Sequence, residues 1–109
     1  MRILAALGLA LGLAAVALAD DEAPTFDIVI RNHKFEPATL EVPANKKVKL
    51  IVKNQDPTPE EFESYELNRE KVIAGNSQAV IFVGPLDPGT YPFFGEFNPA
   101  TAQGKIKAK

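Results

Sequence analysis

The chain has 109 residues, 12 basic and 14 acidic side chains, and a formal net charge of −2. This length provides one domain with one modest core, and the mild acidity argues against a nucleic-acid partner, which would require a basic surface. The sequence contains no Cys or Trp, and its single Met is Met1. Disulfides and thiolate ligands are therefore excluded.

The first 19 residues have the pattern of a secretory signal peptide. Met1 and Arg2 supply a short positive region, residues 3–16 are an unbroken apolar run, and Ala17-Leu18-Ala19 is a small-x-small cleavage site. A membrane anchor is the alternative, but the run is short for a spanning helix. We expect cleavage after about Ala19, a periplasmic location, and a single domain over residues 20–109 that does not span the membrane.

Short segments that alternate apolar and polar side chains follow, which is the pattern of half-buried strands. The alternation is clearest where Val48, Leu50 and Val52 share one face and lysines occupy the other. Pro, Gly and Asn residues punctuate the intervals as turns. We expect strands at residues 26–31, 39–42, 47–53, 61–67, 71–73, 78–83, 90–94 and 105–108.

No part of residues 20–109 sustains the 3.6-residue apolar period of a helix. Residues 60–71 could form a charged helix by propensity, but Phe62, Tyr65 and Leu67 fit a strand followed by a loop better. Seven or eight short strands in a domain of this size predict an all-β sandwich with Greek-key connections. The expected core aromatic residues are Phe26, Phe35, Phe62, Phe82 and Phe93.

Four motifs, in order, resemble those of the cupredoxins, the blue-copper β-sandwich proteins. They are Phe35-Glu36-Pro37, Asn54-Gln55-Asp56 with Phe62 after it, Gly89-Thr90-Tyr91-Pro92-Phe93-Phe94, and Gly104-Lys105-Ile106. The resemblance implies a cupredoxin-like Greek-key fold over nearly the whole of residues 20–109. It also implies where metal ligands would stand. Glu60 replaces the first His, Gly95 the Cys and Asn98 the second His, and no Met lies near Gln103. A type-1 copper site is therefore not expected.

Two segments, residues 59–64 and 93–97, are similar to small periplasmic cupredoxin-like proteins associated with iron-permease uptake systems and to EfeO-type cupredoxin domains. This resemblance implies a carboxylate site for an iron or copper ion. It also implies a membrane iron permease, or other periplasmic uptake components, as partners. Members of this branch carry His at the position of Asn98, so the site predicted here is weaker.

The acidic side chains agree with this implication, because carboxylate and carbonyl oxygens favour harder ions than thiolates do. If both ligand loops meet at one end of the sandwich, Glu60 and Glu96 could approach each other and hold a cation between them. These two are the main predicted metal ligands. The weaker candidates are Glu61, Glu63 and His33, with Asn98 as a neutral oxygen donor.

Strand alternation separates the glutamates of this segment. Glu60 shares a face with Phe62, a core candidate, whereas Glu61 and Glu63 share the other face. Glu60 is therefore the better candidate for a pocket. The alternative is that the glutamates form a solvated edge that prevents aggregation, and that His33 is an ordinary surface residue in a turn.

No enzyme signature is present. The chain has a single His, no Cys, no Gly-x-Ser-x-Gly and no glycine-rich phosphate loop, so we expect a protein that is not an enzyme. Two functions stay open. One is a metal-binding accessory of an iron, or copper-assisted iron, uptake system. The other is a metal-free structural or adaptor module with the same fold.

Overall fold

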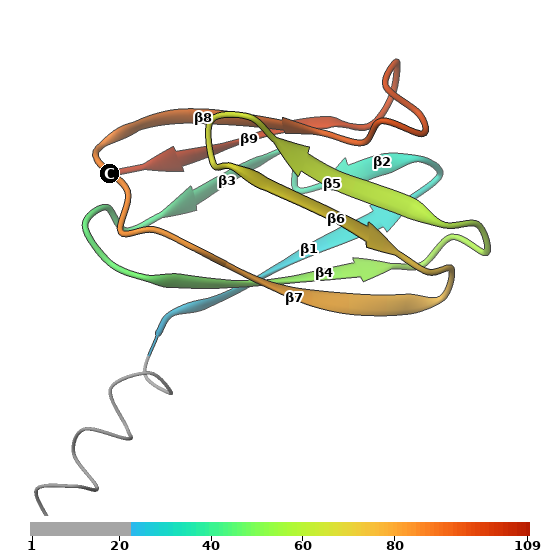
Figure 1. The fold of residues 1–109 in the computed structure, drawn as a ribbon, viewed down its shortest axis with the longest axis horizontal. Helices are drawn as coiled ribbons and strands as arrows, with labels where there is room; N and C mark the ends of the chain where they lie inside the picture. The colour runs from blue at the N-terminus through green and yellow to red at the C-terminus, as the bar shows by residue number, and fades with distance from the viewer. Residues whose placement is uncertain (1–22) are drawn as a thin grey trace, which may run out of the picture.

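A computed structural model describes residues 23–109 as a sandwich of two β-sheets (Figure 1). The predicted signal peptide, residues 1–19, lies outside the described residues. Over residues 23–109, no helix has the length and apolar character needed to cross a membrane.

One sheet has four strands in the order β2-β1-β4-β7, and the other has five in the order β3-β9-β8-β5-β6. Both sheets are mixed, because β1 pairs with β4 and β3 pairs with β9 in parallel while the other pairs are antiparallel. The strands are β1 (Thr25–Arg31), β2 (Lys34–Glu36), β3 (Thr39–Val42), β4 (Val48–Asn54), β5 (Glu60–Ser64), β6 (Arg69–Ile73), β7 (Ser77–Val83), β8 (Gly89–Phe94) and β9 (Gln103–Ala108). The all-β sandwich predicted from the sequence is confirmed.

Each predicted segment contains a strand, with its ends shifted by at most a few residues. The segment predicted at residues 61–67 ends as a strand at Ser64, because residues 65–68 form a turn in which the Asn68 N–H donates to the Tyr65 carbonyl at 3.1 Å. The helical alternative for residues 60–71 is wrong. The sequence interpretation also missed β2, which has only three residues and shows too little alternation to be recognised.

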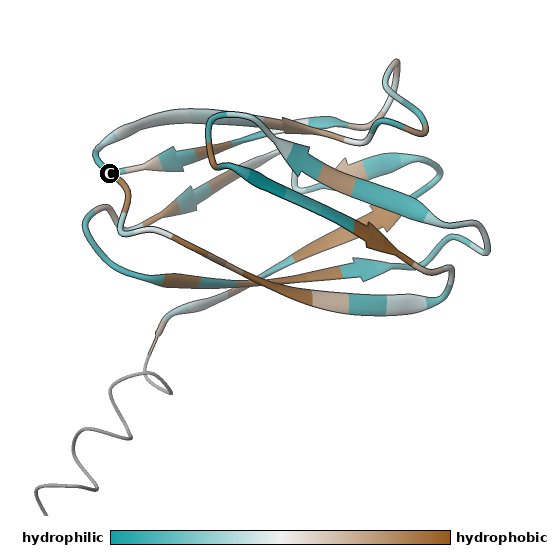
Figure 2. Cartoon of the chain, in the orientation of Figure 1, coloured by the Kyte–Doolittle hydropathy of each residue, from teal (hydrophilic) through white to brown (hydrophobic). Residues whose placement is uncertain are grey.

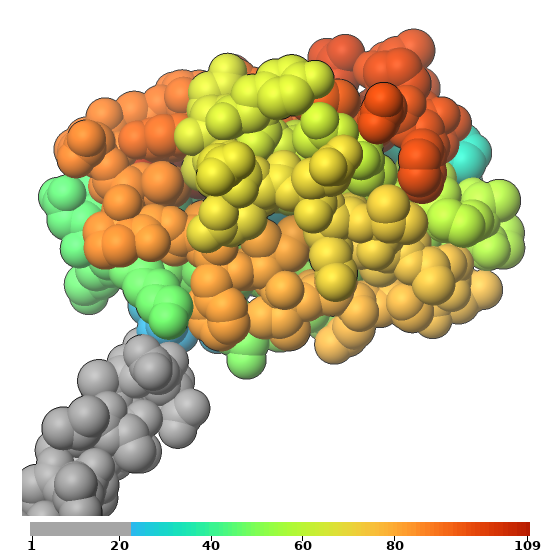
Figure 3. All heavy atoms as spheres, in the orientation of Figure 1, coloured from blue at the N-terminus to red at the C-terminus, as the bar shows by residue number. Residues whose placement is uncertain are grey.

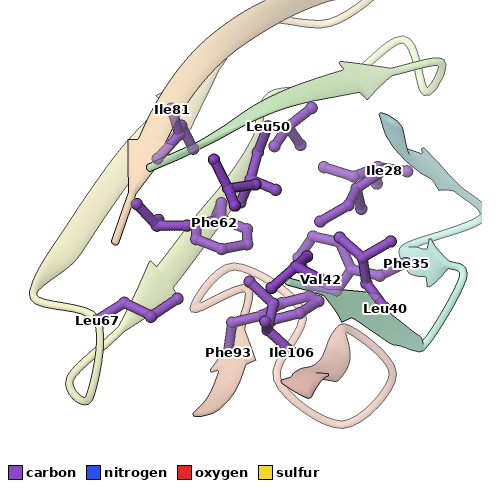
Figure 4. Close-up of a cluster of buried hydrophobic side chains, with 14 of the residues drawn as sticks. Ile28, Phe35, Leu40, Val42, Leu50, Phe62, Leu67, Ile81, Phe93 and Ile106 are labelled. Atoms are coloured by element: carbon purple, nitrogen blue, oxygen red, sulfur yellow. The ribbon is translucent and has the colours of Figure 1, made fainter. Parts of the chain in front are cut away.

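The core lies between the sheets and is built on alternation. Val48, Leu50 and Val52 are fully buried, as their shared face predicted. Phe35, Phe62 and Phe93 form an aromatic cluster in which Phe62 stacks on Phe93 with ring centroids 4.8 Å apart, and Phe35 meets Phe93 edge-on at 4.9 Å (Figure 4). Such pairs add about 1 kcal/mol each beyond the burial of their area.

Phe82 does not belong to this core, which corrects the sequence interpretation. It is 41% exposed, because the alternation of β7 turns Ile81 and Val83 inward and Phe82 outward. The Lys47 ammonium lies 4.8 Å from the centroid of its ring. Phe26 is partly buried and packs against the edge of the core. Coloured by hydropathy, β5 shows one brown segment between teal ones, whereas β7 is brown along much of its length (Figure 2).

Three connections that carry or adjoin predicted site residues lie at one end of the sandwich, on the right in Figure 1. They are the β1–β2 turn, the β4–β5 loop and the β8–β9 loop. The fold therefore brings His33, Glu60 and Asn98 to the same end from positions far apart in the sequence.

Candidate metal centre

The β1–β2 turn presents His33 over the end of the sandwich. Asn32 and His33 both have positive φ, 54° and 59°, which is the conformation of a two-residue hairpin loop. The Asn32 N–H donates to Asp56 Oδ1 at 2.8 Å, and the His33 N–H donates to Asp56 Oδ2 at 3.0 Å. Asp56 is buried and thus anchors the turn that carries the imidazole.

Asn54 fixes the loop that carries Asp56. Its side chain is buried, and its Nδ2 lies within hydrogen-bond distance of the carbonyls of Thr58, Ile73 and Ala74 at 2.8, 3.1 and 3.2 Å. Its Oδ1 accepts from the Asp56 N–H at 3.0 Å. This one amide therefore connects the end of β4 to the β4–β5 and β6–β7 loops.

Glu60 is the centre of the group. It is 1% exposed and lies on the same face of β5 as Phe62. Its Oε2 lies 2.8 Å from His33 Nδ1, and Asn98 Nδ2 donates to Oε2 at 3.0 Å and to Oε1 at 3.3 Å. The turn, the start of β5 and the β8–β9 loop thus meet at one carboxylate.

The electrostatics of the group are unbalanced. Two buried carboxylates, Asp56 and Glu60, face one imidazole, whose Nδ1 is 3.6 Å from Asp56 Oδ2. Even a protonated His33 supplies one positive charge for two negative ones. The described ion pairs of the basic side chains go elsewhere: Arg31 to Glu36, Lys53 to Asp27 and Lys109 to Glu41.

His33, Asp56 and Glu60 each offer one ligand atom, and these three atoms lie within 4.8 Å of one another. An imidazole nitrogen with two carboxylate oxygens is a donor set suited to a divalent transition metal. The His33 side chain is 45% exposed, so the group is open to solvent on the imidazole side.

A thiolate copper site does not fit this chain. The resemblance drawn from the sequence sets Gly95 at the position of the Cys ligand, and its backbone is packed tightly. A Cβ there would lie 2.8 Å from the Glu61 carbonyl oxygen and 3.0 Å from Ala102 Cβ. Backbone atoms at that distance must move before any side chain fits.

We expect that Gly95→Cys lowers the free energy of unfolding by about 1 to 3 kcal/mol, because it overpacks the strand end. We also expect no intense Cu(II)–thiolate absorption when copper is added. Visible spectroscopy and thermal unfolding measure the two effects. Gly89→Ala is the control, because a Cβ at Gly89 meets no atom closer than 3.8 Å. A blue protein of unchanged stability would show that position 95 has room for the ligand.

The structure groups the predicted site residues differently from the sequence interpretation. His33, Glu60 and Asn98 come together, whereas Glu96 joins a second group with Glu61 and Glu63. The reason is that neighbouring strand residues point to opposite faces. Glu60 points into the core, whereas Glu61 points to the other face of β5, where it is still buried at 2% exposure and its Oε1 accepts from the Glu96 N–H at 2.8 Å.

Two acidic members of these groups were not predicted as ligands. Asp56 was noted only as part of the Asn-x-Asp motif after residues 47–53, and this motif was the available signal. Glu70 joins the second group because β5 pairs with β6 in a register that sets Glu63 opposite Glu70. That register cannot be read from residue spacing.

In the second group, the pKa values of two glutamates are raised by their surroundings. The pKa of Glu61 is raised from its usual 4.5 to about 7, chiefly by burial and also by the charge of Glu63, while the hydrogen bond from the Glu96 backbone opposes the rise. Burial also raises the pKa of Glu63, with further contributions from Glu70 and Glu96. The native state therefore binds protons in this group more tightly than the unfolded chain does.

The raised pKa of Glu61 predicts a stability that falls with rising pH. The stabilisation is fully present below pH 4.5 and is lost as the pH rises through about 7. The loss attributable to Glu61 is at most about 3 kcal/mol. Glu61→Gln mimics the protonated acid, so the variant should match the wild type at about pH 4 and exceed its stability at pH 8.

Urea unfolding at the two pH values measures this difference. Glu66→Gln, in the exposed β5–β6 turn, is the control with the same change of charge. Parallel stability curves for the wild type and Glu61→Gln would contradict the assignment of the raised pKa to Glu61.

Comparison with known proteins identifies the family that this chain matches. The family described as "Cupredoxin-like domain" matches residues 3–108. An uncharacterized protein of Rickettsia prowazekii (strain Madrid E) is 48% identical over 79 residues, which are 72% of this chain and 63% of that protein. The chain thus spans less than two thirds of the length of that relative.

Two solved structures illustrate the likeness of fold. The metal binding domain of the Streptococcus pneumoniae Cu(I) exporting P-type ATPase CopA, with Cu(I), is 16% identical with a TM-score of 0.65, covering 78% of this chain and 84% of that one. Auracyanin A, a "blue" copper protein of Chloroflexus aurantiacus, is 15% identical with a TM-score of 0.67, covering 81% and 100%. At these identities the likeness concerns the fold alone.

Proposed function

We propose, because this chain belongs to the cupredoxin-like domain family, that it is an exported metal-binding accessory protein of an iron, or copper-assisted iron, uptake system. In this proposal His33, Asp56 and Glu60 hold an iron or copper ion as cargo. The ion is then passed to a membrane permease or to another periplasmic component. The location and the partner rest on the signal-like residues 1–19 and on the resemblance to the EfeO-type branch.

The observation that carries the proposal is the convergence of two buried carboxylates on one half-exposed imidazole. Glu60 and Asp56 are 1% and 7% exposed, and the described basic side chain beside them is the imidazole of His33. Buried carboxylates that face each other are stabilised by a cation. A bound ion would supply the missing positive charge and would use His33 Nδ1 and one oxygen of each acid.

The arrangement also suits release of the ion. His33 stands on a two-residue turn at the surface, and Asn98 on the β8–β9 loop already donates to both oxygens of Glu60. When the ion leaves, these hydrogen bonds satisfy the carboxylate. The core aromatic cluster and the strands do not depend on the ion, so we infer that the metal is exchangeable rather than structural.

Titration calorimetry with Cu²⁺, and with Fe²⁺ without oxygen, tests the binding. Glu60→Gln should weaken binding at least about tenfold, because it removes the central charge of the group. Glu41→Gln, on the exposed side of β3, is the matched control and should bind as the wild type does. Equal dissociation constants for the wild type and Glu60→Gln would show that this group does not hold the ion.

A metal-free adaptor is the second candidate, and one observation favours it. Both oxygens of Glu60 have hydrogen-bond partners without any ion, through Asn98 and His33. Metal analysis of protein purified from its native compartment separates the candidates. Iron or copper near one equivalent supports the accessory role, and its absence supports the adaptor.

A further inference from the structure

A second group of carboxylates lies on the opposite face of β5 from Phe62 and Glu60. It consists of Glu61 and Glu63 on β5, Glu70 on β6 and Glu96 in the β8–β9 loop. One oxygen from each of these four side chains lies within 4.8 Å of the others. In the space-filling view, the segment that contains β5 and β6, yellow-green to yellow, lies next to the orange-red β8–β9 loop (Figure 3).

One atom of this group lacks a partner. Glu63 Oε1 is buried and, among the residues that the structure describes, makes no hydrogen bond. A buried acceptor without a donor costs roughly 1 to 3 kcal/mol, and more when it is charged. The atom belongs to a side chain that shares the group with three other carboxylates, so the missing partner must be a donor or a cation.

The neighbouring basic residue does not fill this role. Arg69 and Tyr65 line one surface hollow with Glu63 and Glu70. The Arg69 guanidinium, however, donates to backbone carbonyls, from Nε to Phe82 at 2.9 Å and from its Nη1 atom to Asn68 at 2.8 Å. The described ion pairs include none with any of the four glutamates of this group.

The strand register fixes this excess of carboxylates in the sheet. Glu63 stands directly opposite Glu70 across the β5–β6 pair. Like charges in that position destabilise a sheet. Lys71 follows Glu70 along β6, but it pairs in register with Phe62 and so alternates to the other face.

We propose that Glu61, Glu63, Glu70 and Glu96 form a second cation site, separate from His33 and Glu60, that takes a hard divalent cation. The four donors are all carboxylate oxygens, and oxygen-only sites suit ions such as Mn²⁺, Mg²⁺ and Ca²⁺ rather than softer ions. A cation bound there would satisfy Glu63 Oε1 and remove the repulsion between β5 and β6. The raised pKa of Glu61 and of Glu63 is consistent with a group that lacks positive charge.

Mn²⁺ is the probe, because the six-line electron paramagnetic resonance spectrum of the free ion disappears when the ion binds to the protein. We would titrate the wild type, Glu63→Gln and Glu60→Gln, with Glu66→Gln as the control of equal charge change in the adjacent turn. Thermal unfolding without metal verifies that each variant folds. Glu63→Gln should be at least as stable as the wild type, because it removes one of two facing charges.

The proposal expects Glu63→Gln to bind Mn²⁺ at least about tenfold more weakly than the wild type. Glu66→Gln and Glu60→Gln should retain wild-type affinity at this site. Three results would overturn it: no Mn²⁺ binding by the wild type at millimolar concentration, equal affinity in Glu63→Gln, or loss of Mn²⁺ binding in Glu60→Gln. The last result would assign the Mn²⁺ to the His33 group instead.

Discussion

Replacing Asn54 by alanine should lower the free energy of unfolding by about 3 kcal/mol, the largest effect expected of a polar substitution in this chain. The change removes the amide that the carbonyls of Thr58, Ile73 and Ala74 face and the oxygen that accepts from the Asp56 N–H. These backbone groups are then left without a donor or acceptor in a buried place. Urea unfolding measures the loss.

The same variant should also weaken metal binding, because Asn54 holds the loop on which Asp56 stands. Gln78→Ala, an amide removed from an exposed position of β7, is the control and should change neither property. If Asn54→Ala unfolds at wild-type denaturant concentration, the loop is held by other contacts and the support assigned to Asn54 is wrong.

Asn98→His should bind Cu²⁺ at least about tenfold more tightly than the wild type, which is the largest gain of affinity expected from one substitution. Asn98 Nδ2 already lies 3.0 Å from Glu60 Oε2, so an imidazole at this position would place a second nitrogen beside the carboxylate. Imidazole binds Cu²⁺ strongly, whereas the amide nitrogen of Asn is not a ligand. Titration calorimetry gives the dissociation constants.

Asn98→Ala separates the new ligand from the lost hydrogen bond. It removes the donor to Glu60 without adding an imidazole, so its affinity should stay well below that of Asn98→His. Equal affinities in the histidine and alanine variants would mean that position 98 does not face the bound ion.

Alternation predicted most of the fold, because each long strand has one face in the core. The alternation of β4 predicted such a buried face directly, formed by Val48, Leu50 and Val52. Alternation failed where the segment was too short, as in β2, and where an aromatic residue was assigned by type rather than by its place in the period. Phe82 is apolar, but Ile81 and Val83 occupy the buried positions of β7.

The placement of the candidate site residues could be predicted only in part, for similar reasons. The inward direction of Glu60 follows from its spacing to Phe62, and the structure places it at the centre of the His33 group. The approach of Glu96 to Glu60 was expected from the meeting of two loops, but the path of a loop is not encoded in residue spacing. In the structure the Glu96 backbone pairs with Glu61, and Asn98 returns to Glu60.

The most direct test of the central claim is a crystal structure of the protein soaked with Cu²⁺, with anomalous scattering recorded at the copper edge. We expect an anomalous peak within bonding distance of His33 Nδ1 and of carboxylate oxygens of Glu60 and Asp56, with Asn98 turned away from Glu60. The absence of a peak beside His33 and Glu60 at saturating copper, or a peak confined to another surface, would contradict the account.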